Sequence, residues 1–311
     1  MPLLSRRRLI LAKTETTYGT DAVPTGAANA ILVRNLDITP QDADFADRDL
    51  VRPYLGRSEQ LPAGIRAMVS FEVELQASGT AGTAPAWGPL LLACGFAQTI
   101  VASVSVTYAP VSTAFSSLSI YFQVDGVQHR LTGARGTASF SLKKKEIPTI
   151  KFEFTGIYNP VTDTALATPT FTAWITPLPV TNTNTPTFTL HGLAGRMSEL
   201  SVDMACEIVH RDLVGGSQEV LLVDREPNGS VMIEATTVAS KDWWTLAQNA
   251  TLGALALTHG TVAGRRVAIN SSNVQLTNPR YGDEDGVQML QMDMQFIPSS
   301  AGNDEISIVC T

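Results

Sequence analysis

The chain has few of the residues that usually carry chemistry. Its 311 residues include three cysteines and four histidines, and neither type is spaced as a metal site or a disulfide framework requires. Cys94, Cys206 and Cys310 therefore indicate a reduced compartment. No glycine-rich phosphate loop follows a predicted strand, and no nucleophile elbow is present. The sequence predicts no enzyme, no cofactor, no metal and no catalytic residue.

Charge is also scarce. Only 16% of the residues are Asp, Glu, Lys or Arg, whereas about 25% is usual in soluble domains. This deficit suggests that partners cover part of the surface. The net charge of −7 argues against a nucleic-acid clamp, because binding phosphate requires a basic face. It does not argue against a surface that DNA slides past.

Long hydrophobic runs are absent. The longest, Leu90 to Ala97, contains Gly95 and is far too short to span a bilayer. The four apolar residues Leu9 to Ala12, which follow three arginines, are too few for the core of a signal peptide. We therefore expect a cytoplasmic product with no export signal and no membrane partner.

One motif, Arg-Asp-Leu-Val, occurs twice, at Arg48–Val51 and at Arg211–Val214. Its flanks also correspond, since 69–72 resembles 231–234 and 35–38 resembles 199–202. The repeating unit is far longer than that of a solenoid. The pattern predicts two related β domains that arose by duplication.

The predicted chain has four segments. Residues 1–29 are rich in turn residues and are expected to form an arm that contacts a neighbour, with a disordered terminus as the alternative. Residues 30–160 form the first domain and residues 188–311 the second. Residues 161–187, rich in Thr and Pro, form an extended linker.

Each domain is expected to be mainly β with one short helix. Alternating apolar residues predict strands that include 30–38, 67–77, 117–124, 127–132 and 136–143. A helix over 86–95 presents one apolar face that includes Trp87 and Leu90. Its counterpart contains Trp243 and Leu246, with Ser240 or Asp242 as the N-cap. We expect these four residues to lie in the core rather than to form a ligand shelf.

Two long connections, 40–66 and 205–229, contain the repeated motif. Connections of this length are usually functional or disordered. Because the connection recurs in both copies, we expect it to reach a neighbouring subunit, with a plain flexible loop as the alternative. The candidate subunit and ring contacts in the terminal arm and the two loops are Lys13, Glu15, Tyr18, Asp47, Arg48, Asp49, Leu50, Arg52, Tyr54, Arg211, Asp212, Leu213 and Val214.

Two segments carry a resemblance to a known family. Residues 13–25, KTETTYGTDAVPT, resemble the start of tail tube (major tail) proteins of long-tailed, non-contractile bacteriophages. Residues 152–156, FEFTG, resemble the closing strand of their tube domain. The resemblance implies a duplicated form with two tandem tail-tube-like β-barrel or sandwich domains.

The resemblance further implies a structural virion protein in the phage tail, assembled in the host cytoplasm. Three chains would form a pseudo-hexameric ring, and stacked rings would form the conduit for DNA ejection. The implied partners are other copies of the chain, a tape measure protein in the lumen, the tail tip and terminator proteins, and DNA that passes without specific contacts. We hypothesise that carboxylates face the lumen and repel phosphate.

Two alternatives remain at this stage. The tube of a contractile tail or of a secretion machine shares the fold. A carbohydrate-binding β module would instead be a monomer with aromatic residues on an exposed groove.

Overall fold

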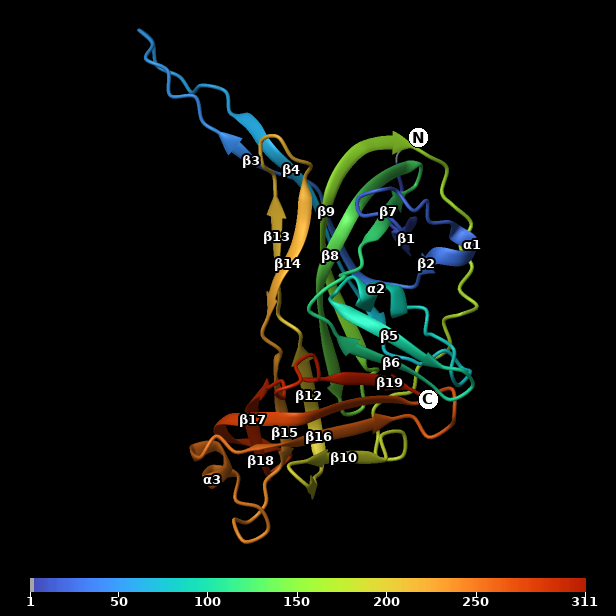
Figure 1. Ribbon diagram of the computed structural model, residues 1–311, viewed down its shortest axis with the longest axis vertical. Helices are drawn as coiled ribbons and strands as arrows, with labels where there is room; N and C mark the ends of the chain where they lie inside the picture. The colour runs from blue at the N-terminus through green and yellow to red at the C-terminus, as the bar shows by residue number, and fades with distance from the viewer. Residues whose placement is uncertain (1–2) are drawn as a thin grey trace.

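The computed structural model describes residues 3–311 and consists almost entirely of antiparallel strands (Figure 1). The mainly β prediction is confirmed. Three helices are short: α1 (Gly26–Asn29), α2 (Gly88–Leu92) and α3 (Trp243–Gln248). The strands of the first half are β1 (Arg8–Thr14), β2 (Ala30–Ile31), β3 (Arg34–Ala46), β4 (Leu61–Glu74), β5 (Phe96–Val101), β6 (Ser105–Pro110), β7 (Leu118–Val124), β8 (Val127–Lys143) and β9 (Thr149–Asp163). The strands of the second half are β10 (Thr187–Leu190), β11 (Leu193–Ala194), β12 (Met197–Asp203), β13 (Cys206–Arg211), β14 (Glu219–Arg225), β15 (Asn228–Glu234), β16 (Leu252–His259), β17 (Val267–Glu284), β18 (Val287–Phe296) and β19 (Ser307–Cys310).

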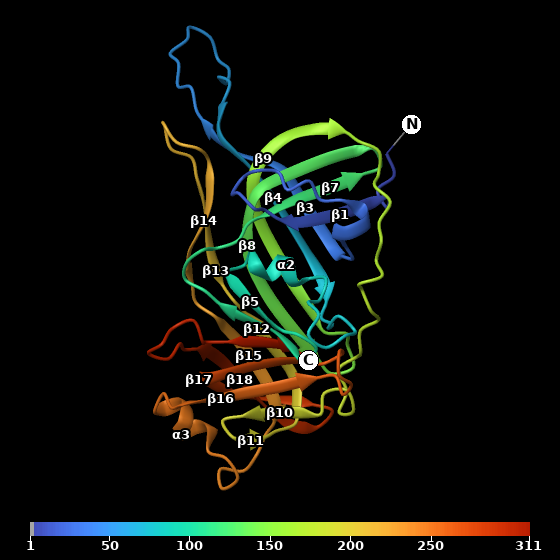
Figure 2. The same ribbon diagram turned by 45° about the vertical axis from the view of Figure 1, so that its right-hand side comes forward.

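One continuous sheet joins the two halves of the chain. Strand β4 pairs with β9, β9 with β8, and β8 with β12. The order continues from β12 to β15, then to β18 and β17. The link between the halves is the antiparallel pairing of residues 139–143 on β8 with residues 199–203 on β12. Figure 2 shows β12 and β15 directly below the lower ends of β8 and β9.

The two faces of this sheet differ in polarity because side chains alternate along each strand. On one face, Phe71, Phe152 and Phe154 are fully buried, with ring centroids about 6 Å apart. The opposite face carries Ser70, Glu153 and similar polar residues. The apolar face is therefore covered by the rest of the chain, whereas the polar face is left for solvent or partners.

The N-terminal segment is not the arm that its composition predicts. Strand β1 pairs along its whole length with β7. Its residues Leu9–Ala12 are all buried, Ile10 and Ala12 in the main core and Leu9 and Leu11 in a second cluster with Tyr121. A continuous apolar run of this kind is typical of a strand buried on both faces. The segment is thus part of the first half.

The two helices predicted to pack on the sheet are present but shorter than expected. Trp87 immediately precedes α2, is fully buried and donates a hydrogen bond from Nε1 to the Gln76 carbonyl at 2.7 Å. Trp243 is buried in the same way and bonds Thr236. Asp242 is the N-cap of α3 and accepts from the Thr245 amide at 2.9 Å. Leu90 is fully buried and Leu246 packs at the margin of the core.

Corresponding ion pairs occur in the two halves. Arg34 lies 3.2 Å from Glu72, and Arg196 lies 3.0 Å from Glu234. Both residues of the second pair follow those of the first by the same interval (196 − 34 and 234 − 72, each 162). The sheet register agrees, since Ile38 pairs with Val69 and Leu200 with Val231. Ile38 therefore corresponds to Leu200, and the match of 35–38 with 199–202 is wrong by two residues.

The predicted strands at 127–132 and 136–143 are a single strand. Gly133, with φ of +60°, lies where the register of β8 with β9 shifts between Thr132 and Arg135. A bulge of this kind bends a strand without ending it. A sequence pattern loses its alternation at such a point, which explains the predicted break.

The proline-rich linker is packed against the body rather than free. Trp174 donates from Nε1 to the Ala30 carbonyl at 3.0 Å, and Val180 is buried. His259 holds the end of the linker, with Nδ1 2.9 Å from Thr185 and Nε2 3.0 Å from the Leu178 carbonyl. Burial lowers the pKa of His259. No helix within residues 3–311 has the length and apolar character needed to cross a membrane.

Candidate assembly surfaces

The first arm is a hairpin formed by β3 and β4, which projects far beyond the body (Figure 1). The connection predicted over 40–66 is therefore mostly strand, and only residues 47–60 are irregular. The candidate residues Asp47, Arg48, Asp49, Leu50, Arg52 and Tyr54 all lie in this loop. Val51 and Leu55 are fully exposed, and Tyr54 is largely exposed. Within residues 3–311, the loop buries none of these apolar side chains.

Polar contacts shape the loop of the first arm. Arg48 pairs with Glu59, and Arg52 lies 3.7 Å from the same carboxylate. Asp47 accepts from the Gln60 side chain across the base of the loop. The charged candidates thus brace the loop, and the apolar ones remain exposed at its end.

The second arm is the two-stranded sheet of β13 and β14. Its tip holds the candidates Arg211, Asp212, Leu213 and Val214, all exposed. The end of its ladder next to the tip is docked on the first half, where Val220, which pairs with His210, is fully buried. Arg135 donates from Nη1 to the Val220 carbonyl at 2.8 Å, and the Val220 amide donates to the Tyr18 hydroxyl at 2.5 Å.

Tyr18 and Arg135 form the site on the first half that contacts the second arm. The Arg135 guanidinium lies 4.7 Å from the centroid of the Tyr18 ring, a cation–π contact. Burial raises the pKa of Tyr18, so its hydroxyl stays protonated at neutral pH. Tyr18 is therefore used within the chain, whereas Lys13 is exposed.

Glu15 is not placed at a surface. It is buried and accepts hydrogen bonds from Ser117, Ser119 and the Gly133 amide at 2.6–2.8 Å. A buried carboxylate needs such donors to offset the loss of water. Glu15 fixes the turn after β1 and the bulge of β8. This structural role cannot be read from the sequence, because Glu15 lies in a polar stretch.

The two arms lie beside one another (Figure 1). Asp212, near the tip of the second arm, lies beside Gly64 on β4. Arg66 on β4 forms ion pairs with Asp42 at 2.6 Å and with Asp44 at 3.2 Å. Burial lowers the pKa of nearby His210, and the charge of Arg66 lowers it further. His210 is therefore neutral at physiological pH.

The polar face of the joint sheet is concave. Two hollows lie on it, one of about 620 Å³ around Ser141, Ser201 and Asp293, and one of about 450 Å³ around Ser70 and Glu153. Its acidic residues are Asp37, Glu72, Glu74, Glu153, Glu199, Asp203, Glu234 and Asp293. Its basic residues include Arg34, Lys143, Lys151, Arg196 and Arg280.

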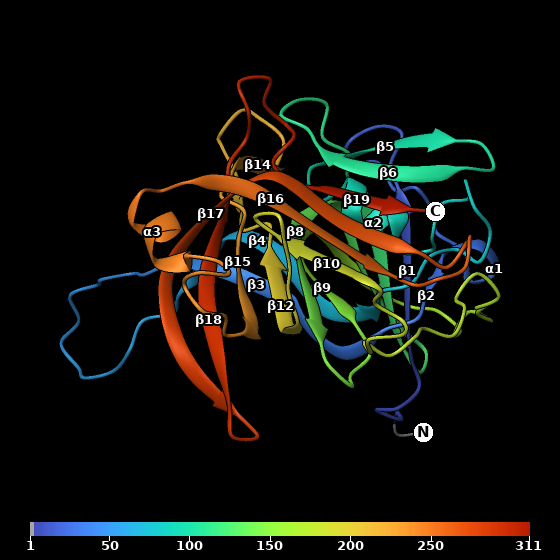
Figure 3. The same ribbon diagram turned by 90° about the horizontal axis from the view of Figure 1, so that it is seen from below.

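Two sheet edges are uncovered. Among residues 3–311, β3 pairs only with β4, and no strand pairs with the outer edge of β17 beyond Gln275. Figure 3 shows this part of β17 and β18 as a hairpin that curves away from the body. Tyr281 on β17 is 63% exposed and lies 5.3 Å from Trp244, centroid to centroid. Unpaired strand edges of this length are available for pairing with another chain.

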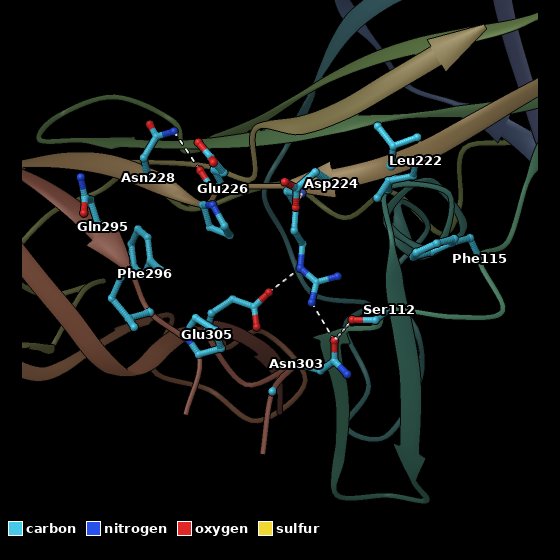
Figure 4. Close-up of a pocket in the computed structure, with 16 residues that line it drawn as sticks. Ser112, Phe115, Leu222, Asp224, Glu226, Asn228, Gln295, Phe296, Asn303 and Glu305 are labelled. Carbon is cyan, nitrogen blue, oxygen red and sulfur yellow. Dashed lines mark hydrogen bonds and ion pairs between the residues drawn. The ribbon is translucent and has the colours of Figure 1, made fainter. Parts of the chain in front are cut away.

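A pocket of about 820 Å³ lies where the second half meets the first (Figure 4). We call it the junction pocket. Its lining comes from β14 and the residues after it, the end of β18, the loop before β7 and the loop before β19. Arg225 pairs with Glu305 and bonds Asn303 at 2.7 Å, which holds the walls together. The sequence contains no local signal for this pocket, because its lining comes from three regions that are far apart in the chain, 112–115, 222–228 and 295–305.

The described residues contain no metal site. Across 3–311, no group of three or more His, Cys, Asp or Glu residues is arranged to hold an ion. Cys94, Cys206 and Cys310 are buried free thiols, and burial raises the pKa of Cys206 to about 11. The exposed features of the described residues are sheet edges, arms and a concave polar face, and open strand edges of this kind can pair with another chain.

Comparison with known proteins agrees with this geometry. No curated protein matches the chain. Residues 5–297 match the family described as phage tail tube protein, which covers nearly the whole chain. The chain therefore belongs to the phage tail tube protein family and is a structural protein of the virion tail, not an enzyme.

Proposed function

We propose that this chain is a duplicated, two-domain tail tube protein and that three chains form one ring. The corresponding ion pairs Arg34–Glu72 and Arg196–Glu234 support duplication, as do the two arms with the same motif. The two domains would be residues 30–160 and 188–311, with β1 added to the first. Three chains then supply six domains, so the ring is pseudo-hexameric.

The observation that carries the proposal is a difference between corresponding strands. Strand β12 is paired on both sides, with β15 and with β8 of the other half. Strand β3, its counterpart, is paired on one side, and β17, the counterpart of β8, has a free edge. The contact made once inside the chain is therefore available to be repeated between chains, β3 of one copy against β17 of the next.

Repetition of this contact closes a ring and removes the free edges. The partly exposed side chains Leu36 and Ile38 on β3 and the exposed Tyr281 on β17 would become covered. The counterpart of Ile38 on β12, Leu200, is already fully buried. Duplication also lowers the entropic cost of assembly, because every second domain contact is made within one chain.

The concave polar face would line the lumen. Several of its cations are neutralised by ion pairs on the same face, such as Arg280 with Asp293 at 3.0 Å. Carboxylates such as Asp37, Glu199 and Asp203 then give the face an acidic character. DNA is held by cationic side chains that displace its counterions, so an acidic lumen lets it pass without specific contacts.

The non-contractile type of tail rests on the resemblance of residues 13–25 and 152–156. The tube of a contractile tail or secretion machine is the competing assignment. In either setting the tape measure protein would occupy the lumen, and the tail tip and terminator proteins would contact the two ends of the tube.

Electron microscopy of the concentrated protein, combined with mass measurement, tests the proposal. We expect hollow tubes, with end views that show six similar units per ring. Rings released from tubes should weigh about 100 kDa, since three chains of 33.3 kDa make one ring. Rings of six chains would show that duplication does not replace hexamer formation. Tubes without a resolved lumen would contradict the assignment of the concave face.

A further inference from the structure

The repeated motif has the same exposure at both of its positions. Leu50 and Leu213 are 45% and 52% exposed, and Val51 and Val214 are fully exposed. Each Leu-Val pair lies at the end of a projecting hairpin (Figure 2). Identical apolar tips on two separate arms indicate that both are used to contact one kind of surface.

The second tip cannot reach the junction pocket of its own chain. Val223 lies in the pocket wall, and Val214 lies in the loop of residues 212–218, with the strand segment Glu219–Val223 between them. This segment spans about 13 Å, and it is held in place by its pairing with β13 and by the burial of Val220. A tip that enters such a pocket must therefore come from another copy.

The junction pocket combines apolar walls with carboxylates. Its apolar surface comes from Phe115, Leu222 and Phe296, and its acidic residues are Asp224, Glu226 and Glu305. Figure 4 shows the labelled side chains around the cavity. Arg225, which pairs with Glu305, adds a cation to the pocket. The motif offers a complementary set, in which a Leu-Val pair follows an Arg-Asp pair. Arg211 of the second tip is exposed, whereas Arg48 of the first is already paired with Glu59.

Glu305 provides independent evidence that the pocket can accept a hydrogen-bond donor from another segment. It is 3% exposed, and one carboxylate oxygen pairs with Arg225. The other, Oε2, is buried with no hydrogen-bond partner within residues 3–311. Buried carboxylate oxygens are normally satisfied, so an N–H donor carried by an incoming segment would complete this site.

We propose that the Arg-Asp-Leu-Val tips of one copy dock into junction pockets of other copies in the adjacent ring. The inference rests on the proposed ring, and it names the surface that receives the arms. Each chain carries two such tips and one junction pocket within residues 3–311.

Cysteine cross-linking in assembled tubes tests the docking. A double variant, Val214→Cys with Val223→Cys, places one thiol at the tip and one in the pocket wall, and a second variant combines Val51→Cys with Val223→Cys. The native thiols are buried, so background cross-linking is low. We expect at least one variant to give a ladder of linked chains on non-reducing gels after air oxidation of tubes, and no ladder from dissociated chains.

The matched control is Val214→Cys with Val238→Cys, since Val238 is as exposed as Val223 but lies outside the pocket. Tubes that form normally but give no ladder with either pocket variant would overturn the docking and leave the tube function intact. A ladder with the control alone would do the same. Absence of tubes from the unmodified protein would instead count against the proposed function.

A substitution series gives a second measure. Val51→Asp and Val214→Asp together should preserve single rings but reduce tube length at least tenfold, whereas Val238→Asp should leave tube length unchanged. Normal tubes from the double variant would contradict the inference.

Discussion

Strands β3 and β12 occupy corresponding places in the two halves, yet their surroundings differ. Each pairs on one side with the strand that follows its arm, β4 or β15. On the other side, β12 is covered by β8, and Leu200 is fully buried, whereas Ile38 on β3 is partly exposed. The comparison shows corresponding positions that are covered in one half and open in the other. Under the proposed ring, the open edge of β3 is the one that another copy of the chain covers.

The largest effect is expected from a charge at the completed contact. Leu200→Asp should lower the free energy of unfolding by several kcal/mol, because it buries an unpaired carboxylate in the core. Ile38→Asp, at the corresponding position, should lower the free energy of unfolding clearly less than Leu200→Asp does, because Ile38 packs against the core but is partly exposed, and it should abolish ring formation. Urea denaturation and sizing of the assembled protein distinguish the two effects. Equal destabilisation by both substitutions would mean that Ile38 is needed for folding as much as Leu200 is, and it would contradict the assignment of β3 as an open edge for assembly.

A smaller contrast is expected between two adjacent tryptophans. Trp243 is buried in the core, and Trp244 is 37% exposed beside Tyr281 at the free edge of β17. Trp243→Ala should cost about 3–5 kcal/mol of stability, measured by chemical denaturation. Trp244→Ala should cost about 1 kcal/mol or less and weaken ring formation instead. Similar stability losses would indicate that the edge near Tyr281 belongs to the core.

Removal of the loop of the first arm should leave folding of the chain intact and prevent the stacking of rings into tubes. Deletion of residues 48–58 with a short glycine turn leaves β3, β4 and the pairs of Arg66 with Asp42 and Asp44 intact. We expect a thermal midpoint within a few degrees of the original, since the loop buries no core residue, and no tubes in electron micrographs. Normal tubes would exclude the first arm from assembly.

The smallest effect is expected on the concave face. Glu199→Lys and Asp203→Lys should leave tubes intact and slow DNA release from the virion severalfold, because added cations bind phosphate. The effect should weaken as salt is raised. Asp163→Lys is the control for charge alone, because Asp163 is exposed at the end of β9 and is not among the residues that line the junction pocket or the two hollows of the polar face. Unchanged release from both face variants would place the lumen elsewhere.

Much of the fold could be predicted from local patterns. The alternation in 67–77, the Asp125-Gly126 turn and the N-cap Asp242 each act over a few residues, and each is found as expected. Two errors have physical causes. The apolar run Leu9–Ala12 lacked alternation because both faces of β1 are buried, and Gly133 interrupted the pattern of β8 without ending the strand.

The candidate contacts were predicted only in part. The motif at 48–51 and 211–214 identified both arm tips, because repetition can be recognised without coordinates. Glu15 and Tyr18 were assigned to an arm, but they are held inside the chain by Ser117, Ser119 and the second arm. Their partners lie about a hundred residues or more away, and the sequence gives no sign of such distant pairing.

The sequence by itself determined the class of the fold, the repetition and the two arms, since these follow from periodicity and from local turns. Only the tertiary structure decided that β8 pairs with β12, that β3 and β17 are left open, and that three distant regions of the chain enclose the junction pocket. Hydrogen bonding between strands is available to any extended segment. The choice of partner is fixed by which edges the packed core leaves uncovered.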